Sequence, residues 1–252
     1  MSSPQDLVRP CDIKGILHSH SRWTDGAHSL GSMVETAREI GLEYLGISDH
    51  YRSEAHQEGL DLGALKIQLA EIERLRRENP GFDVLQGIEL DAEPDGSLPL
   101  ESETLAQFDY VIVSFPENGG YDPGTFTEQV MRAASHPSVS ILAQPLGDLM
   151  LRQQNGILDM EKVLEAAAAG RTAVEVTTNP TCSELDWTHC RRAQELGVFM
   201  SISPNAHRAA RLVDFRHGAE RAREAGLVCA SILNTLTSEE LRRYWASGEI
   251  PR

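Results

Sequence analysis

The stretch KGILHSH (residues 14–20) is a short apolar run that ends in polar, imidazole-bearing residues. Such runs are short, apolar and rich in β-branched residues, which is typical of buried β-strands. Six more runs of this kind follow, at residues 44–50, 83–91, 110–115, 139–145, 173–179 and 198–204. The sequence therefore predicts seven strands, and the same pattern places polar residues at the ends of several of them.

Amphipathic stretches separate these runs, with apolar residues at three- and four-residue spacing and often a glycine at the end, as in α-helices with a glycine C-cap. The predicted helices cover residues 29–41, 62–78, 125–135, 159–170 and 184–197. Alternating strands and helices indicate parallel strands joined by right-handed crossovers. We therefore expect an α/β fold, a distorted seven-stranded (β/α)7 TIM-like barrel, with an open doubly wound sheet as the alternative. Residues 116–124 (PENGGYDPG) are expected to form a loop over one end of the barrel.

The length and composition fit one globular domain. The chain has 252 residues, of which 40% are hydrophobic and 24% charged, and we expect a single barrel domain over residues 1–252. No apolar run approaches the roughly 20 residues of a membrane helix, and the N-terminus lacks the apolar core of a secretion signal. These features predict a cytoplasmic protein with no membrane partner.

Charge and cysteine content exclude several classes of protein. The formal net charge is −15, whereas duplex DNA binding depends on Lys and Arg that neutralise phosphates, so we expect no strong duplex binding. A small phosphorylated substrate or the end of a nucleic acid remains compatible with this charge. The four cysteines form no CxxC pair, which argues against a thiolate zinc site or a disulfide framework. The sequence contains neither GxGxxG nor a P-loop.

The residues able to carry chemistry collect where the predicted strands end. The carboxyl ends of barrel strands form the rim on which active sites are built. Residues with imidazole or carboxylate groups at these ends are His18, His20, Asp49, His50, Glu89, Asp91 and His207. A single His-x-His pair is often structural, but recurrence at the ends of four strands favours a site for Zn²⁺, Mn²⁺ or Fe. Glu175 and Asn179 end the sixth strand, where they either join the site or serve barrel hydrogen bonding. The remaining histidines are interpreted as surface or packing residues: His28, His56, His136, His189 and His217.

The ordered series of motifs resembles the PHP (polymerase and histidinol phosphatase) superfamily. The motifs that carry this resemblance are LHSHSRWTDG, GLEYLGISDH, GIELDAEPDGSL, ILAQPLG, VEVTTNP and NAHR. The chain is most similar to the C-terminal PHP domain of bacterial family-X DNA polymerases, from about residue 8 to about residue 248. It looks like a stand-alone PHP protein. The resemblance implies a distorted barrel with up to three metal ions at its rim and phosphoester hydrolysis as the activity.

The resemblance also implies roles for particular residues, which we expect to be catalytic. The family's first metal position takes the two histidines of HxH, a Glu and a late Asp, and the third takes an early Asp and two histidines. By motif position, the residues carried over are His18, His20, Asp25, His50, Glu89 and His207. Arg52 and Arg152 are candidate phosphate-binding residues, because arginine suits bidentate oxyanion contacts; the alternative is an ordinary surface arginine.

Three ligand positions depart from the family pattern. Pro116 and Gln144 replace histidines of the second metal position, and Asn205 replaces the late Asp. Proline has no side-chain ligand atom, and amide oxygens are weak ligands for transition metals. We therefore expect one or two ions per chain rather than three, with Asn205 as a possible fourth ligand of the first. Two functions remain open: a metal-dependent phosphoesterase with a reduced site, and a catalytically inactive PHP module for binding or scaffolding.

Overall fold

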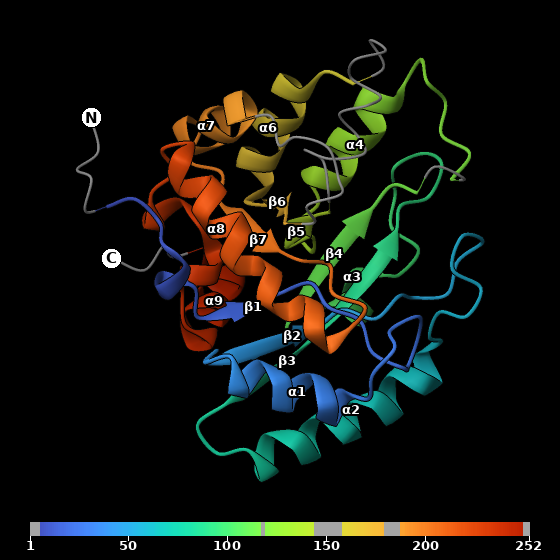
Figure 1. Cartoon of the computed structure of the whole chain (residues 1–252). Coiled ribbons are helices and arrows are strands. Elements are labelled where there is room, and N and C mark those ends of the chain that lie inside the picture. Colours follow the sequence, from blue (N-terminus) through green and yellow to red (C-terminus); the bar gives the residue numbers. More distant parts are fainter. Residues whose placement is uncertain (1–5, 117–118, 144–157, 179–186, 249–252) are drawn as a thin grey trace.

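The computed structural model describes residues 6–116, 119–143, 158–178 and 187–248. Seven parallel strands pair in sequence order and alternate with helices, so the predicted distorted (β/α)7 TIM-like barrel is confirmed (Figure 1). The strands are β1 (Gly15–Ile16), β2 (Tyr44–Ile47), β3 (Asp83–Asp91), β4 (Tyr110–Ser114), β5 (Ile141–Leu142), β6 (Ala173–Thr177) and β7 (Met200–Ser203). Six of them are shorter than the predicted runs, and β3 has the predicted bounds.

Helices cover the outside of the sheet. Those described are α1 (Leu30–Glu39), α2 (Leu62–Glu78), α3 (Ser102–Leu105), α4 (Phe126–Ala134), α6 (Met160–Gly170), α7 (Trp187–Glu195), α8 (Phe215–Glu224) and α9 (Ser238–Ser247). In Figure 1, α1 and α2 lie against β2 and β3, whereas α4, α6 and α7 cover the opposite side. The five predicted helices are present within the described residues, and the sequence reasoning missed α3, α8 and α9. Within those residues, no helix is long and apolar enough to cross a membrane.

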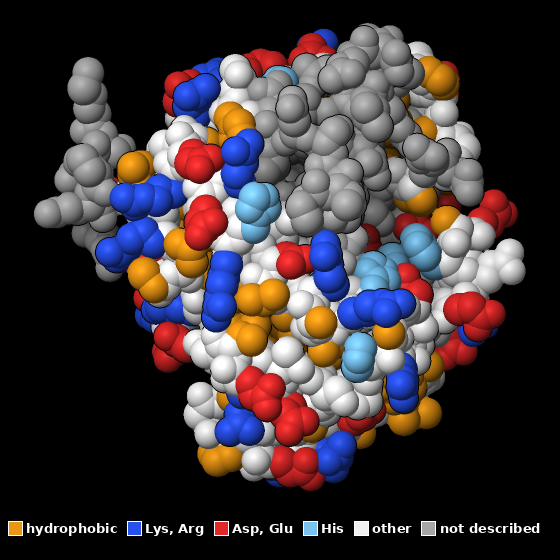
Figure 2. All heavy atoms as spheres, in the orientation of Figure 1, with side chains coloured by type: hydrophobic (Ala, Val, Ile, Leu, Met, Phe, Trp, Pro, Cys, Tyr) orange, Lys and Arg blue, Asp and Glu red, His pale blue; other side chains and the backbone are white. Residues whose placement is uncertain are grey.

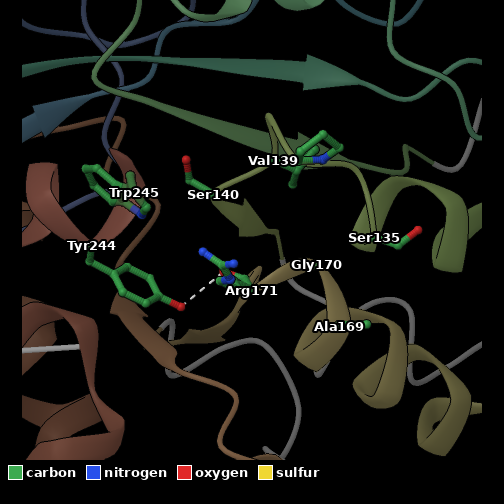
Figure 3. Close-up of a pocket in the computed structure, with 9 residues that line it drawn as sticks. Ser135, Val139, Ser140, Ala169, Gly170, Arg171, Tyr244 and Trp245 are labelled. Atoms are coloured by element: carbon green, nitrogen blue, oxygen red, sulfur yellow. Dashed lines mark hydrogen bonds between the residues drawn. The ribbon is translucent and has the colours of Figure 1, made fainter. Parts of the chain in front are cut away.

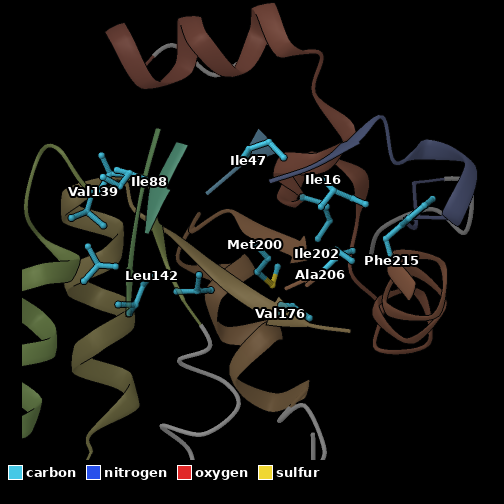
Figure 4. Packing of buried hydrophobic residues seen from close by; sticks show 14 of the residues in the cluster. Ile16, Ile47, Ile88, Val139, Leu142, Val176, Met200, Ile202, Ala206 and Phe215 are labelled. Atoms are coloured by element: carbon cyan, nitrogen blue, oxygen red, sulfur yellow. The ribbon is translucent and has the colours of Figure 1, made fainter. Parts of the chain in front are cut away.

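The main hydrophobic core lies between the strands and the helices. Its residues include Ile16, Ile47, Ile88, Leu142 and Met200 (Figure 4), each with no exposed surface. These side chains come from five different strands and meet the apolar faces of the surrounding helices. Burial of the apolar face of each helix fixes the helices on the barrel. The helices in turn fix the loops at the rim of the barrel.

The barrel interior is filled by tyrosine rings that only glycine neighbours accommodate. Tyr110 is buried inside the strands, and its hydroxyl donates to the carbonyl of Leu17 at 2.5 Å. A Cβ added at Gly46 would lie 2.4 Å from the Tyr110 hydroxyl, and one at Gly87 would lie 2.2 Å from its ring. Small residues on β2 and β3 therefore make room for the ring, which fills the interior beneath the site.

The barrel closes between its first strand, β1, and its last strand, β7. Ser19 and Ala206 form an isolated parallel bridge just beyond these strands, and the amide of His20 donates to the carbonyl of Ala206 at 3.0 Å. Lower down, the side chain of buried Asn234 joins the two strands. It donates to the carbonyl of Gly15 at 2.9 Å and accepts from the amide of Ile202 at 2.7 Å. The first and last strands are thus held together at both levels.

Candidate metal centre

The polar strand ends meet at the carboxyl-terminal rim of the barrel. His18 and His20 follow β1, His50 follows β2, and Glu89 lies near the end of β3. His18 and His20 have no exposed surface, and Glu89 is only 4% exposed. Figure 2 shows pale blue histidine and red acidic side chains reaching the surface side by side in this view, with Lys or Arg side chains next to them.

Glu89 is the centre of the first cluster, which we call the Glu89 group: His18, His20 and Glu89. Its Oε2 atom lies 3.0 Å from His18 Nε2 and 3.4 Å from His20 Nε2. The same oxygen lies 3.4 Å from His50 Nδ1. One carboxylate oxygen therefore faces three imidazoles, in a place where water has little access.

The second cluster, the Asp25 group, contains His20, Asp25, His50 and His207. Asp25 Oδ2 lies 2.8 Å from His207 Nε2 and 3.7 Å from His50 Nε2, and Asp25 Oδ1 lies 3.6 Å from His20 Nδ1. The ring of His20 stacks on those of His50 and His207, with centroids 4.6 and 4.3 Å apart. The two groups therefore lie next to each other and share His20.

The spacing of these atoms fits a metal ion. Ligand atoms around a tetrahedral ion with bonds of about 2.0–2.1 Å lie about 3.3 Å apart, and the distances above run from 2.8 to 3.7 Å. Buried polar atoms without a hydrogen-bond partner support the same conclusion, since such atoms are rare. Within the described residues they include both ring nitrogens of His20, Nδ1 of His50 and Oδ1 of Asn205. The donor set of imidazoles and carboxylates suits Zn²⁺, Mn²⁺ or Fe²⁺.

Electrostatics at the site follow from burial and close opposite charges. Burial lowers the pKa of His20 and of His50, which keeps these rings neutral. Burial also opposes ionisation of His18, but the charges of Glu175 and Glu89 outweigh it and raise the pKa of His18 to about 10. The charge of His18 in turn holds the pKa of Glu89 well below its usual range, against the effect of burial.

Glu175 lies behind His18 and is completely buried. His18 Nδ1 donates to Glu175 Oε2 at 2.5 Å, which leaves Nε2 directed at Glu89. A carboxylate on the far nitrogen fixes the ring tautomer and orientation in histidine metal sites. The sequence left two roles open for Glu175, and the structure places it in contact with a candidate ligand.

Asp49 follows β2, beside the site, and hydrogen-bonds to the turn after β1 that carries Asp25. Its carboxylate accepts hydrogen bonds from the backbone amide and hydroxyl of Ser21, the hydroxyl of Thr24 and the amide of Gln68, at 2.6–2.7 Å. All four bonds are directed at a buried carboxylate, which is how such a group is stabilised away from water. Asp49 therefore orders the turn that presents Asp25 to the histidines.

Asn205 and His207 occupy the turn after β7. Asn205 has a positive φ of 45°, a left-handed conformation that asparagine tolerates better than most residues. The ring of His207 donates through Nδ1 to the carbonyl of Asn205 at 3.1 Å, so that Nε2 faces Asp25. The turn thus orients His207 through the backbone of Asn205, while the buried Oδ1 of Asn205 has no hydrogen-bond partner.

Other predicted site residues have different surroundings. Pro116 follows β4, half-buried, with no ligand atom on its side chain. Arg52 is exposed, and its Nε donates to the carbonyl of Gly59 at 3.2 Å. Gln144 and Arg152 lie outside the described residues. The structure therefore brings together the six carried-over positions, with Asn205 beside them, and leaves the phosphate-binding role of the arginines a prediction.

A third cluster was missed by the sequence reasoning, which interpreted His56 as a surface or packing residue. His56 Nδ1 lies 2.8 Å from Asp91 Oδ2, and its ring stacks on His50 with centroids 3.6 Å apart. The hydrogen bond to Asp91 raises the pKa of His56. We call His50, His56 and Asp91 the Asp91 group. His56 lies in a loop outside any motif, so no periodicity pointed to it.

A cavity of about 260 Å³ lies at the opposite end of the barrel (Figure 3). It is lined by residues that precede β5 and β6, such as Ser140 and Arg171, and by Tyr244 and Trp245 of α9. Its described lining contains no imidazole or carboxylate. Barrel active sites are built at the carboxyl ends of the strands, so this cavity is not the candidate site.

Comparison with protein families identifies a match to the model described as PHP domain, over residues 17–179. The chain is 32% identical to the "DNA polymerase/3'-5' exonuclease PolX" of Bacillus subtilis, over 95% of this chain and 42% of that protein. It therefore spans less than half the length of that relative. It is also 24% identical to a probable phosphatase of Thermoanaerobacter sp. (strain X514), over 88% of this chain and 91% of the relative.

Two solved structures share the fold. One is a histidinol phosphate phosphatase from Lactococcus lactis complexed with zinc, L-histidinol and phosphate, with a TM-score of 0.60 and 15% identity over 83% of this chain and 93% of that chain. The other is a putative histidinol phosphatase from Listeria monocytogenes, with a TM-score of 0.58 and 13% identity over 79% of this chain and 97% of that chain.

Proposed function

Since the chain belongs to the PHP domain family, we propose that it is a metal-dependent phosphoric ester hydrolase with one or two divalent ions per chain rather than three. The observation that carries this proposal is the pair of adjacent groups that share His20 at the barrel rim. Two such groups suit two ions held close together, an arrangement that supports attack of water on a phosphoester. Zinc, manganese and iron remain alternatives for their identity.

The proposed first ion is held by the Glu89 group, with Asn205 as a fourth ligand. The Oδ1 atom of Asn205 has no hydrogen-bond partner, which supports this role. A neutral amide oxygen nevertheless binds a transition metal more weakly than a carboxylate does. Glu175 holds the proton on Nδ1 of His18, so that binding of the ion displaces the proton from Nε2 and uses the lone pair of that nitrogen.

The proposed second ion is held by Asp25, His50 and His207 of the Asp25 group, because the single lone pair of a neutral His20 serves the first ion. His207 keeps its Nδ1 proton on the carbonyl of Asn205 and directs Nε2 at Asp25. Asp49 fixes the turn that carries Asp25, which limits how far this exposed carboxylate swings away. Bound ions would generate hydroxide at neutral pH and stabilise charge on the phosphoryl oxygens.

The reduced set of ligands is part of the proposal. Pro116 contributes no ligand at a position where the family resemblance implies a histidine, and Gln144 stands at a second such position. Fewer ions leave less positive charge for a phosphoryl transition state, which depends strongly on electrostatic stabilisation. We therefore propose slow turnover or a changed substrate preference, with Arg52 and Arg152 as candidate phosphate contacts.

A catalytically inactive role in binding or scaffolding is the second candidate. The observation in its favour is Pro116 at a ligand position, because a change to proline removes a ligand outright. Against it, six ligand positions are retained, and the structure brings their side chains into two compact groups.

Substitution of the candidate ligands tests the proposal. The purified protein is loaded with Zn²⁺ or Mn²⁺ and assayed on phosphomonoesters and on single-stranded DNA with a free 3′ end. We expect hydrolysis by the wild type and its loss in His18→Ala and His207→Ala, with His217→Ala as a surface control. Circular dichroism checks that the variants fold. No hydrolysis by the wild type under any metal condition would favour the scaffold.

The substrate class follows from the same panel. We propose a small phosphorylated substrate or a nucleic-acid end, in keeping with the net charge of −15. One relative is called a probable phosphatase and another a DNA polymerase with exonuclease activity, which supports testing both classes. The cytoplasmic location and the single domain over residues 1–252 remain predictions.

A further inference from the structure

We propose that the Asp91 group is an alternative binding site for the second divalent transition-metal ion, made from His56 and Asp91 together with the shared ligand His50. One atom from each of its three residues lies within 4.8 Å of the others. The inference deepens the proposed function, since it concerns the same metal centre. Two imidazoles and one carboxylate form a donor set used for Zn²⁺ and Fe²⁺.

Asp91 is held in place as a metal-binding carboxylate would be. It ends β3 and is buried, and its Oδ1 accepts a hydrogen bond from the hydroxyl of Ser114 at 3.1 Å. Its Oδ2 accepts from the hydroxyl of Ser53 and contacts His56 Nδ1 at 2.8 Å. Because ligand atoms of a tetrahedral ion lie about 3.3 Å apart, an ion needs His56 Nδ1 and Asp91 Oδ2 to separate by about 0.5 Å. It also needs the ring of His50 to tilt out of its stack on His56, so that the lone pair of His50 points at the ion.

The loop after β2 also holds His56 firmly. The amide of His56 donates to the hydroxyl of Ser53 at 2.9 Å, and the carbonyl of His56 accepts from Ser53 at 3.2 Å and from Gly59 at 2.9 Å. A Cβ at Gly59 would lie 2.6 Å from the backbone of Arg52, so the loop is tightly folded at this point. The loop therefore presents the imidazole to Asp91 with little freedom.

His50 connects this group to the site already described. Its Nε2 lies 3.7 Å from Asp25, whereas its Nδ1 is buried and has no hydrogen-bond partner. A neutral imidazole offers one lone pair, so His50 serves one ion at a time. The Asp25 group and the Asp91 group are thus alternative positions of one ion.

The location of the group agrees with the missing ligands. Asp91 pairs in register with Ser114 of β4, and Pro116 follows two residues later. The Asp91 group therefore lies on the side of the rim where Pro116 stands at a position for which the family resemblance implies a histidine ligand. His56 and Asp91 supply an imidazole and a carboxylate there.

Zinc stoichiometry in four proteins tests the inference. Chelator competition counts tightly bound Zn²⁺ in wild type, His56→Gln, Asp25→Asn and the double variant. The Asp25→Asn variant keeps the Asp91 group, whereas the double variant has lost a ligand from both positions. We expect two equivalents in the wild type and in each single variant, and one in the double variant.

If the double variant binds as much zinc as Asp25→Asn alone, His56 holds no ion and the inference is overturned. Asp25→Asn combined with His217→Gln is the matched control, because His217 is an exposed histidine on α8, and it is expected to match Asp25→Asn alone. Asp91→Asn replaces His56→Gln if that variant fails to fold. The assay is independent of catalysis: the expected zinc contents without any hydrolysis would contradict the proposed function and still support the Asp91 group.

Discussion

Replacing Glu175 tests whether the carboxylate behind His18 sets the metal affinity of the Glu89 group. The 2.5 Å contact is completely buried and fixes which nitrogen of His18 faces Glu89. Loss of such a partner typically weakens metal binding 10- to 100-fold, or about 1.4 to 2.8 kcal/mol. Glu175→Gln keeps an acceptor for the Nδ1 proton, so we expect its loss of zinc affinity to be about 10-fold. Glu175→Ala removes the acceptor, so we expect its loss of zinc affinity to be about 100-fold.

The assay is competition of the protein with a chromophoric zinc chelator at neutral pH. Glu195→Gln on α7 is the matched control, because that side chain is 66% exposed and should leave the affinity unchanged. Thermal unfolding in the presence of EDTA separates effects on folding from effects on metal binding. A folded Glu175→Ala protein that binds zinc as tightly as wild type would refute the role assigned to this carboxylate.

Two further predictions concern the barrel. Gly87→Ala would place a methyl group 2.2 Å from a buried tyrosine ring and should lower the free energy of unfolding, measured by urea denaturation, by about 1–3 kcal/mol or more. Gly31→Ala in α1, where the nearest atom to an added methyl group is the Ser29 hydroxyl oxygen at 4.0 Å, should be neutral or stabilising by contrast. Burial alone would raise the pKa of Asp83. The hydrogen bond and positive charge of Arg242 outweigh the effect of burial, so the pKa of Asp83 is lowered. A lowered folded pKa adds stability above the unfolded pKa that is lost as the pH falls through the folded value. Acid unfolding below about pH 4 should therefore be steeper in wild type than in Arg242→Gln, as monitored by circular dichroism.

The sequence predicted the barrel well because its strands are apolar runs and most of its helices have regular amphipathic spacing. α8 was missed because its buried face contains small residues, among them Gly218 and Ala222, which weaken the apolar pattern. α9 did carry a signal, since Thr237 and Glu240 form a capping box at its start. Its buried apolar face is short, with only Leu241 and Tyr244, so the amphipathic spacing alone does not predict this helix.

The candidate site was predictable where chemistry follows a strand. His18, His20 and Glu89 stand at strand ends, so the barrel topology alone brings them together. His56 was not predictable in this way, because its position depends on how a loop folds back over β3. The role of Glu175 behind His18 depends on a side-chain rotamer across 157 residues of sequence, which no spacing rule encodes.

The closure between Ser19 and Ala206 makes the metal centre a property of the whole chain. Asp25 and His207 are 182 residues apart in sequence and meet only when the ring is complete. Contacts of such long range form at a high entropic cost and slow folding. A ligand that binds only the closed ring repays part of that cost, by about 2.7 kcal/mol at a free concentration 100 times its dissociation constant. A bound ion would therefore hold the segment after β1 against the segment after β7. Removal of the ion should raise amide hydrogen exchange first in these two segments.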